Sequence, residues 1–473
     1  MTAGELTAVA RPQESQSWSI LPLFVGVLLI PAVLGSSLTI FNDGDTSWHL
    51  ATGEWILDHR AIPHTDVFSF TWAGKAWTAM GWLADIIYAG VYRLSGYAGI
   101  SALVTAALMA LHAIVYLNMT RSVRPVAAVA ALIGLDVALI PMLLARPHIL
   151  AWPIAALWIW LLMQARECDR APSLWWAPLI ALWSNFHASV LMGLLIAAVF
   201  GLEALVSSAD RVRAFRQWSL FGIACLIALF ANPNGMATVL YPLRIANLKI
   251  LPLIDEWKPS NPNITPFFFG VVALVVALIA WRRPRLHWVR WLLLAGLLGL
   301  ALLQMRHQWM FAIVTAMILP QGFAANEVVK RTVDRSAARI AAAGAVLLVA
   351  TRAIMPLTPP DNEANPWKLI ASIPPELRSQ PVLNGYSMGG PLILSGIKTY
   401  IDGRSDMYGD ELVLEYMRMT HGDARALAEA VQRWNIRWAI LPNSKKGIAA
   451  LLDRTPGWRK IRQDKVGVIY VRD

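Results

Sequence analysis

The stretch "WSILPLFVGVLLIPAVLGSSLTIFNDGDTSWHL", residues 18–50, joins a long apolar run to an acidic loop. Residues 18–40 carry no charged side chain, and about 20 such residues are enough to cross a bilayer as a helix. Asp43 and Asp45 follow directly. Because the run is long, lacks a strongly basic start and precedes many further apolar runs, we interpret it as an uncleaved first transmembrane helix.

The whole chain has the composition of a polytopic membrane protein. It is 57% hydrophobic and only 15% charged, which excludes an ordinary soluble protein. Its 22 tryptophans fit a chain with many membrane interfaces. A run at 82–93 is too short to span and is predicted to be an interfacial or re-entrant helix. About eleven transmembrane helices are predicted, at 18–40, 98–118, 126–144, 149–164, 174–186, 189–206, 218–231, 266–281, 288–304, 309–323 and 340–355.

The basic residues predict the orientation. The net charge is +11, but the arginines and lysines gather in short loops between apolar runs, so we infer no nucleic-acid partner. If the amino terminus is cytoplasmic, about sixteen Lys or Arg lie on that side and about eight in the short loops opposite; apart from Arg11, those sixteen lie in the loops at 121–124, 166–170, 211–216, 282–290 and 330–339. Cytoplasmic loops are enriched in Lys and Arg, so the first loop and the carboxyl-terminal tail are predicted to face outward.

The chain is therefore divided into three parts. Residues 1–17 form a cytoplasmic tail, residues 18–355 a transmembrane module with a first outer loop at 41–97, and residues 356–473 a small periplasmic or extracytoplasmic α/β domain. A proline-rich break, "MPLTPPDNEANP", precedes the last part. Alternation within it predicts strands at 381–384, 398–402, 437–441 and 466–471, and helices at 409–418 and 423–434.

Unusual polar residues gather at the outward ends of the predicted helices. Ionisable groups at membrane depth are costly and usually face a cavity or a partner, so their shared side suggests a cavity that opens outward. Each one alone also fits a helix cap or an interfacial anchor. The candidates are Arg146, His148, Asn185, His187, Asn232, Glu256, Trp257, Arg306 and His307.

These residue types favour one kind of chemistry. The sequence contains no phosphate-binding glycine loop, metalloprotease helix or GxSxG elbow. A carboxylate opposite arginines suits transfer of a group from an anionic leaving group: Asp takes the acceptor's proton, and Arg or His neutralises the departing phosphate. The pattern thus predicts glycosyl transfer from a polyprenyl phosphate.

The same arrangement resembles the GT-C superfamily of membrane glycosyltransferases, in which an Asp or Glu of the first outer loop is catalytic or binds metal. "DGDTSWHLATGEWILDHRAIPHTDVFSFT" (43–71) looks similar to a bacterial, largely uncharacterised branch. "RPH" (146–148), "NFH" (185–187), "NPNG" (232–235), "NGYSMGG" (384–390) and "DGRSDMYG" (402–409) add to this resemblance.

The resemblance implies roles for particular residues. Asp45 matches the catalytic carboxylate best and Asp43 is second; the two would also be the ligands of a divalent cation, if one is required. Arg306, His307 and Arg146 are expected near the donor phosphate. Asp66 and the two glycine-containing tail motifs are expected to be turns.

The resemblance also implies partners and a location. The donor would be a sugar linked to a polyprenyl phosphate or pyrophosphate, and the acceptor a glycan, lipid or protein. The protein would lie among the lipids of the bacterial inner membrane and act in cell-envelope polysaccharide biosynthesis. Two alternatives stay open: a transporter or flippase of lipid-linked oligosaccharides, which often has related halves that are not seen here, and an O-antigen-type ligase or polymerase.

Overall fold

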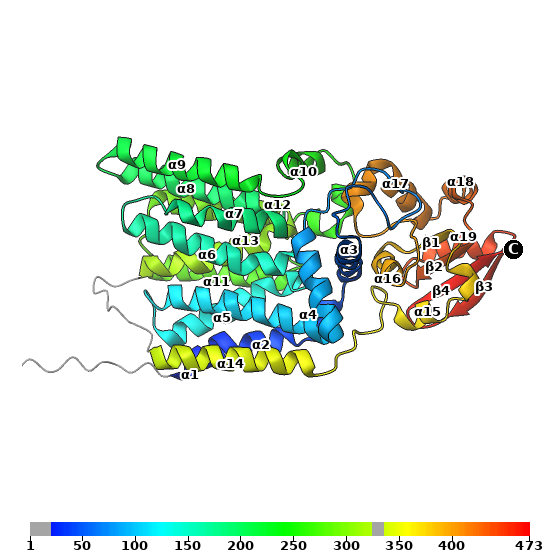
Figure 1. Ribbon diagram of the computed structural model, residues 1–473, viewed down its shortest axis with the longest axis horizontal. Helices are drawn as coiled ribbons and strands as arrows, with labels where there is room; N and C mark the ends of the chain where they lie inside the picture. The colour runs from blue at the N-terminus through cyan, green and yellow to red at the C-terminus, as the bar shows by residue number, and fades with distance from the viewer. Residues whose placement is uncertain (1–19, 324–334) are drawn as a thin grey trace, which may run out of the picture.

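The chain folds into a helical bundle with a smaller mixed α/β unit at one end (Figure 1). The computed structural model describes residues 20–323 and 335–473. The predicted cytoplasmic tail, residues 1–17, lies outside the described residues. Figure 1 places α1 at one end of the bundle and the sheet beyond the opposite end, so the first described helix and the carboxyl terminus lie far apart.

The first apolar run is helical but not uniform. It consists of α1 (Ile20–Phe24), the π-helix η1 (Val25–Leu29) and α2 (Ile30–Gly35). Gly35 packs so closely on the next long helix that a Cβ there would lie 2.3 Å from Oγ1 of Thr105. A side chain at this position would therefore push the first helix away from the bundle.

Helices occupy each described apolar run, but their lengths vary. Six are long and apolar enough to cross a membrane. The predicted number of about eleven spans stays a prediction. The six are α4 (Trp82–Met119), α5 (Pro125–Leu139) continued by η3 (Ile140–Met142), α6 (His148–Glu167), α8 (Val190–Ser207), α9 (Arg211–Leu229) and α14 (Arg335–Ile354).

The remaining bundle helices are shorter. Apolar helices of 10–17 residues include the first run, Ile20–Gly35, and α10, α11 and α12. The bounds are α7 (Pro178–Phe186), α10 (Met236–Ala246), α11 (Pro266–Arg282), α12 (Trp288–Leu303) and α13 (Gln308–Ile318), with 3₁₀ turns η4 (Leu174–Trp176), η5 (Leu251–Leu253), η6 (Asp255–Trp257), η7 (Met305–His307) and η8 (Leu319–Phe323). The turns η6 and η7 carry candidate site residues.

The long helix α4 is broken near its start. Gly96 has φ +59° and ψ −145°, a conformation that glycine adopts readily because it has no Cβ. The segment before Gly96 contains the run predicted to be an interfacial helix, and the segment after it coincides with the predicted second span. Figure 1 shows the early part of α4 beside α3 (Asp45–His59), between the bundle and the sheet.

The tail contains a four-stranded sheet in the order β1-β2-β4-β3. Strand β1 pairs parallel with β2, and β4 pairs antiparallel with β2 and β3. The strands are β1 (Val382–Asn384), β2 (Trp438–Pro442), β3 (Trp458–Gln463) and β4 (Gly467–Arg472), and the helices are α15 (Trp367–Ala371), α16 (Gly389–Leu394), α17 (Ser405–Thr420), α18 (Ala424–Trp434) and α19 (Lys446–Arg454).

Most of the predicted tail elements are present, with one error. The predictions at 381–384, 437–441 and 466–471 are confirmed as β1, β2 and β4, and both predicted helices exist. The prediction of a strand at 398–402 is wrong. That segment makes a single bridge, Thr399 with Ser69 of the first loop, and Tyr400 forms a bend. Residues 399–402 are all buried, so the segment is a buried loop.

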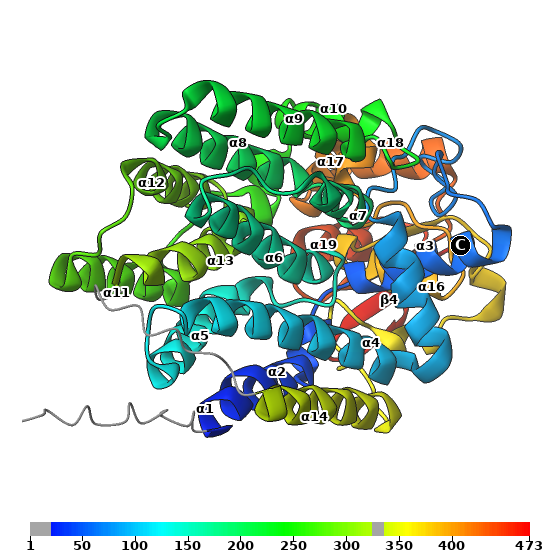
Figure 2. The ribbon, with the colours of Figure 1, turned by 60° about the vertical axis from the view of Figure 1, so that its left-hand side comes forward.

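The first loop and the tail are packed together closely. Thr71 donates a hydrogen bond to the carbonyl of Tyr400 at 2.7 Å, and the Phe70 amide donates to Thr399 at 3.1 Å. A Cβ at Gly390 would lie 1.9 Å from the carbonyl oxygen of Gly44. Figure 2 again shows α3 beside α16 after the molecule is turned. This contact brings the two glycine-containing tail motifs to the start of α3.

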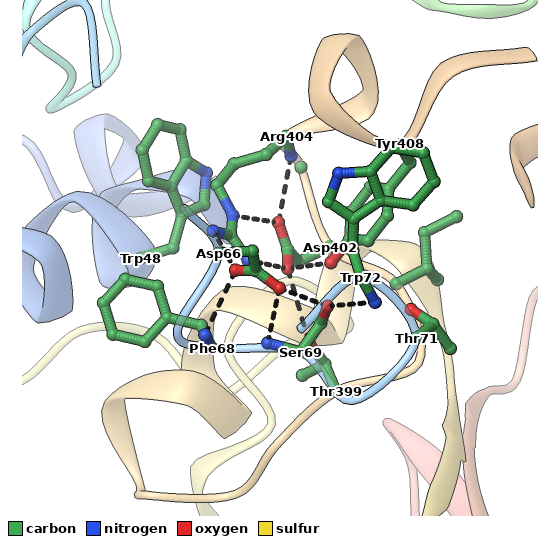
Figure 3. Close-up of polar contacts among 12 residues, drawn as sticks. Trp48, Asp66, Phe68, Ser69, Thr71, Trp72, Thr399, Asp402, Arg404 and Tyr408 are labelled. Atoms are coloured by element: carbon green, nitrogen blue, oxygen red, sulfur yellow. Dashed lines mark hydrogen bonds and ion pairs between the residues drawn. The ribbon is translucent and has the colours of Figure 1, made fainter. Parts of the chain in front are cut away.

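A buried ion cluster fixes that contact. Arg404 donates to Oδ1 of Asp66 at 2.7 Å from one nitrogen and to both carboxylate oxygens of Asp402 from two others, at 2.7 and 2.8 Å. Figure 3 shows the guanidinium between the two carboxylates. Asp66 also accepts from the amides of Phe68 and Ser69, so the predicted turn role of Asp66 is confirmed. Its ion pair with the tail was not predicted.

Candidate functional site

Asp45 stands where the first loop becomes a helix. It is the first residue of α3, after Gly44 at the N-cap position. Helix N-termini favour negative charge because their first amide groups lack partners within the helix. The amide of Asp45 donates to Oδ1 of Asp43 at 3.3 Å. The short turn therefore holds both predicted carboxylates at one point, directly after the first apolar helix.

Arg146 lies at the centre of three carboxylates. Its Nη2 donates to Oδ1 of Asp43 at 2.7 Å and lies 3.1 Å from Oδ2 of Asp45. Its Nε donates to the other oxygen of Asp43, and its Nη1 donates to Glu256. The structure thus brings together four residues predicted from three distant segments. Arg146 is paired with carboxylates here rather than left open for a phosphate.

The environment of Asp45 changes its proton affinity. Burial raises the pKa of Asp45 to about 7, and the nearby Asp43 and Glu256 carboxylates add to the rise, while the Arg146 guanidinium opposes it. About a fifth of the side chain, 21%, is exposed. A carboxylate with a pKa near the working pH is well suited to act as a general base.

The tail completes this environment. A Cβ at Gly403 would lie 1.8 Å from Oδ1 of Asp45, so only glycine leaves room for the carboxylate. Tyr386 donates to the carbonyl of Gly403 at 3.2 Å. Burial raises the pKa of Tyr386, and the negative charge of Asp45 raises it further. Both residues belong to tail motifs that we expected to be turns, and their place beside Asp45 was not predicted.

Arg306 is a cation close to this cluster whose donors are free. Its guanidinium lies 3.9 Å from the centre of the Trp257 ring, a cation–π contact. Among the described residues it has no hydrogen-bond or ion-pair partner. Burial lowers the pKa of Arg306, and the negative charges of Glu256 and Asp406 oppose this shift. Arg306 therefore fits the predicted role of phosphate ligand better than Arg146 does.

His307, the neighbour of Arg306, has a different character. Its Nε2 is paired with Oε1 of Gln304 at 3.1 Å. Burial, together with the positive charge of Arg306, lowers the pKa of His307 to about 4, so the ring is neutral near pH 7. A neutral imidazole offers a phosphate one N–H donor and no charge.

Four other candidates have structural partners. Asn185 accepts from Trp82 Nε1 at 2.6 Å and donates to two backbone carbonyls. Asn232 accepts from the amide of Asn234 and the hydroxyl of Thr238, which fixes the local turn before α10. Asn185 thus joins α7 to the start of α4 and to the end of α9, and the contacts of Asn232 are local. Their contacts are those of structural residues.

The two remaining histidines face each other. His148 and His187 have ring centroids 6.2 Å apart. His148 Nε2 is 2.7 Å from the Met142 carbonyl oxygen, and His187 Nδ1 is 2.8 Å from Ser189 Oγ. Each ring therefore has one nitrogen held locally.

A histidine on α3 was not singled out from the sequence. His49 lies one helical turn after Asp45, and its Nδ1 is 2.7 Å from Oδ1 of Asp85 at the start of α4. Burial lowers the pKa of His49, as does the positive charge of Arg146. The i+4 spacing of His49 from Asp45 could have indicated that the two residues share a face of the helix. The contact of His49 with Asp85 could not be predicted, because Asp85 is distant in the sequence and reaches His49 only through the packing of α4 on α3.

One solved structure resembles the whole fold of this chain. The chain is similar to the archaeal oligosaccharyltransferase AglB from Archaeoglobus fulgidus, solved in complex with an inhibitory peptide and a dolichol-phosphate. The TM-score is 0.57 at 11% identity, over 97% of this chain and 75% of that one. No protein-family model and no curated protein matches the sequence. At this identity the likeness shows a shared fold, and it does not address the bacterial branch.

Proposed function

We propose that this protein is a glycosyltransferase of the bacterial inner membrane that moves a sugar from a polyprenyl-phosphate donor to a glycan, lipid or protein acceptor at the outer face. The observation that carries the proposal is the position of Asp45. It lies at the start of α3, with a pKa near 7, within a group that also holds Arg146, Glu256 and Arg306. The fold shared with an oligosaccharyltransferase supports the same class of reaction.

The residues fit a single displacement at the sugar's anomeric carbon. The acceptor oxygen forms a bond to that carbon as its proton passes to the Asp45 carboxylate. The bond from the anomeric carbon to the phosphate oxygen breaks, and the phosphate keeps the electron pair. Arg306, whose donors are free, would balance the charge on the departing phosphate. The lipid tail of the donor would remain among the membrane helices.

The test is Asp45→Asn in the full chain. The amide keeps the shape of the side chain but cannot take the acceptor's proton, so transfer should fall by on the order of 100-fold or more. Asp43→Asn, which alters the neighbouring carboxylate, is the matched control and should cost less. Glycolipid or polysaccharide output is measured in cells, and folding by size-exclusion chromatography.

Full output from a folded Asp45→Asn protein would contradict the catalytic assignment. In that case the cluster of polar residues around Asp45 would be better explained as part of the path of a transporter, whose function does not require a general base.

A further inference from the structure

Arg146 uses all three guanidinium nitrogens on carboxylates. Nε and Nη2 hold Asp43, Nη2 also lies beside Asp45, and Nη1 holds Glu256. The Arg146 charge lowers the pKa of Glu256, so this carboxylate is ionised near neutral pH. Three carboxylates that meet at one point require a cation between them, and here the cation is a side chain.

The backbone around Arg146 is tied to the same loop. The amide of Ala145 donates to the Ile40 carbonyl at 2.8 Å, and the Thr46 hydroxyl donates to the Ala145 carbonyl at 3.1 Å. The hydroxyl of Tyr88 donates to the carbonyl of Arg146 at 3.0 Å. Arg146 therefore enters the carboxylate cluster from a fixed point of the fold, with partners in the first loop and in α4.

A divalent cation does not fit beside this guanidinium. Magnesium and calcium bind carboxylate oxygens at about 2.0 to 2.6 Å, where the arginine nitrogens already stand. A metal ion held by Asp43 and Asp45 would have to displace the contacts of Arg146 to both of them. The described residues contain no group of three or more His, Cys, Asp or Glu side chains arranged to hold a metal ion.

We propose that Arg146 takes the place of a divalent cation in this site: its guanidinium holds Asp43, Asp45 and Glu256 together, and sugar transfer proceeds without a bound metal ion. The part that concerns transfer rests on the proposed function. Arg146 then acts as a positioning residue for Asp45, and the donor phosphate is left to Arg306. This differs from the sequence-based expectation that Arg146 binds phosphate and that Asp43 and Asp45 are the metal ligands, if there are any.

The experiment measures Mn²⁺ binding to the purified full chain by electron paramagnetic resonance. The unaltered protein should show no stoichiometric Mn²⁺ site. Arg146→Ala removes the guanidinium and leaves the carboxylates facing one another, so it should bind one Mn²⁺ at least about tenfold more tightly than the unaltered chain. Adding Asp43→Asn to Arg146→Ala should abolish the acquired site, which would place that site at the cluster.

A matched control is available in the same region. Arg93 also holds two carboxylates, Glu54 at 2.7 Å and Asp58 at 2.5 Å, but 43% of its side chain is exposed. Arg93→Ala should acquire no Mn²⁺ site, because only two mobile carboxylates remain. If Arg146→Ala does not fold, Arg146→Gln provides a milder variant that also removes the charge.

Two results would overturn the proposal. One is a stoichiometric Mn²⁺ site in the unaltered protein that Asp43→Asn or Glu256→Gln weakens. The other is the absence of any gain in both folded Arg146 variants. Transfer measured with and without EDTA gives a second readout, and it should not change. If no transfer is detected under any condition, the proposed function fails while Mn²⁺ binding still decides the role of the arginine.

Discussion

At the scale of single residues, the proton affinity of Asp45 links structure to reaction. Its pKa of about 7 results from burial first, and from the carboxylates of Asp43 and Glu256, against the attraction of Arg146. Because a general base must be unprotonated, the transfer rate should rise with pH and be about tenfold lower at pH 6 than at pH 8. The measurement is the initial rate of transfer in purified protein across this range.

The Asp43→Asn variant tests the cause of the shift. Removing the neighbouring negative charge takes away one contribution that raises the pKa of Asp45, so the midpoint of the rate profile should move to lower pH. The same substitution frees the Arg146 guanidinium from Asp43, so that it can interact more strongly with Asp45, and this also lowers the pKa of Asp45. A midpoint that moves to higher pH, or a rate that does not depend on pH in the unaltered protein, would contradict the role of Asp45 as base.

The contrast between Arg306 and His307 gives a second prediction for single residues. Arg306 is charged and has free donors, whereas His307 is neutral and paired with Gln304. Arg306→Ala should weaken donor binding by about 1.5 to 3 kcal/mol, roughly 10- to 150-fold. His307→Gln, which removes no charge at neutral pH, should weaken it less. Donor affinity is measured with a fluorescent polyprenyl phosphate, and equal effects in both variants would contradict the assignment.

At the scale of elements, the tail motif that contains Gly403 and Arg404 shapes the first loop. Gly403 leaves the space that the Asp45 carboxylate occupies, since a Cβ there would lie 1.8 Å from Oδ1. Gly403→Ala should displace the carboxylate and reduce transfer strongly while the protein still folds. Gly90→Ala on α4 is the control, because no atom lies within 4 Å of the added carbon. Transfer and thermal stability are compared for both variants.

Arg404 should be needed for stability rather than for the reaction. Both of its partners, Asp66 and Asp402, are fully buried, so Arg404→Ala would leave two uncompensated carboxylates in the core. Breaking a buried ion pair in this way costs about 3 to 5 kcal/mol. The expected result is a large drop in the midpoint of thermal unfolding. The exposed pair of Arg425 and Glu429 is the control, and Arg425→Ala should change that midpoint little.

These elements also show what the sequence could and could not predict. Arg146 was found because charges beside apolar runs stand out and the predicted outward ends of the helices share one side, whereas Asp45 and Asp43 were chosen from the resemblance to the first-loop carboxylate of GT-C enzymes. Gly403 and Tyr386 were missed because their motifs also look like ordinary turns, and the contact with Asp45 links positions more than 300 residues apart. The segment at 398–402 was mistaken for a strand because Thr399, Tyr400 and Ile401 are residue types that favour strands, whereas here they are buried in a loop against the first loop.

At the scale of the whole molecule, the contact between the first loop and the tail constrains topology. Asp66 is paired with Arg404, and Ser69 bridges Thr399, so both segments must lie on the same side of any membrane that the bundle crosses. Figure 2 shows the last bundle helix, α14, beside α1 and α2. Figure 1 shows that α1 and α14 both begin at the end of the bundle away from the sheet, and that the chain leaves α14 at the end where the tail lies. Which side is outside stays a prediction from the Lys and Arg bias.

Cysteine labelling in intact cells tests that topology. The chain has two cysteines, of which Cys225 is buried and Cys168 is exposed between α6 and α7, in a loop predicted to be cytoplasmic. Ala73→Cys in the first loop and Lys398→Cys in the tail replace exposed residues on the opposite side. A membrane-impermeant maleimide should label both introduced cysteines in intact cells, because both face outward. Cys168 should react only after the cells are permeabilised.

Labelling of Cys168 alone in intact cells would reverse the predicted orientation and place Asp45 on the cytoplasmic side. Labelling of only one of the two introduced cysteines would contradict the packing of the tail on the first loop, on which the position of Gly403 beside Asp45 depends.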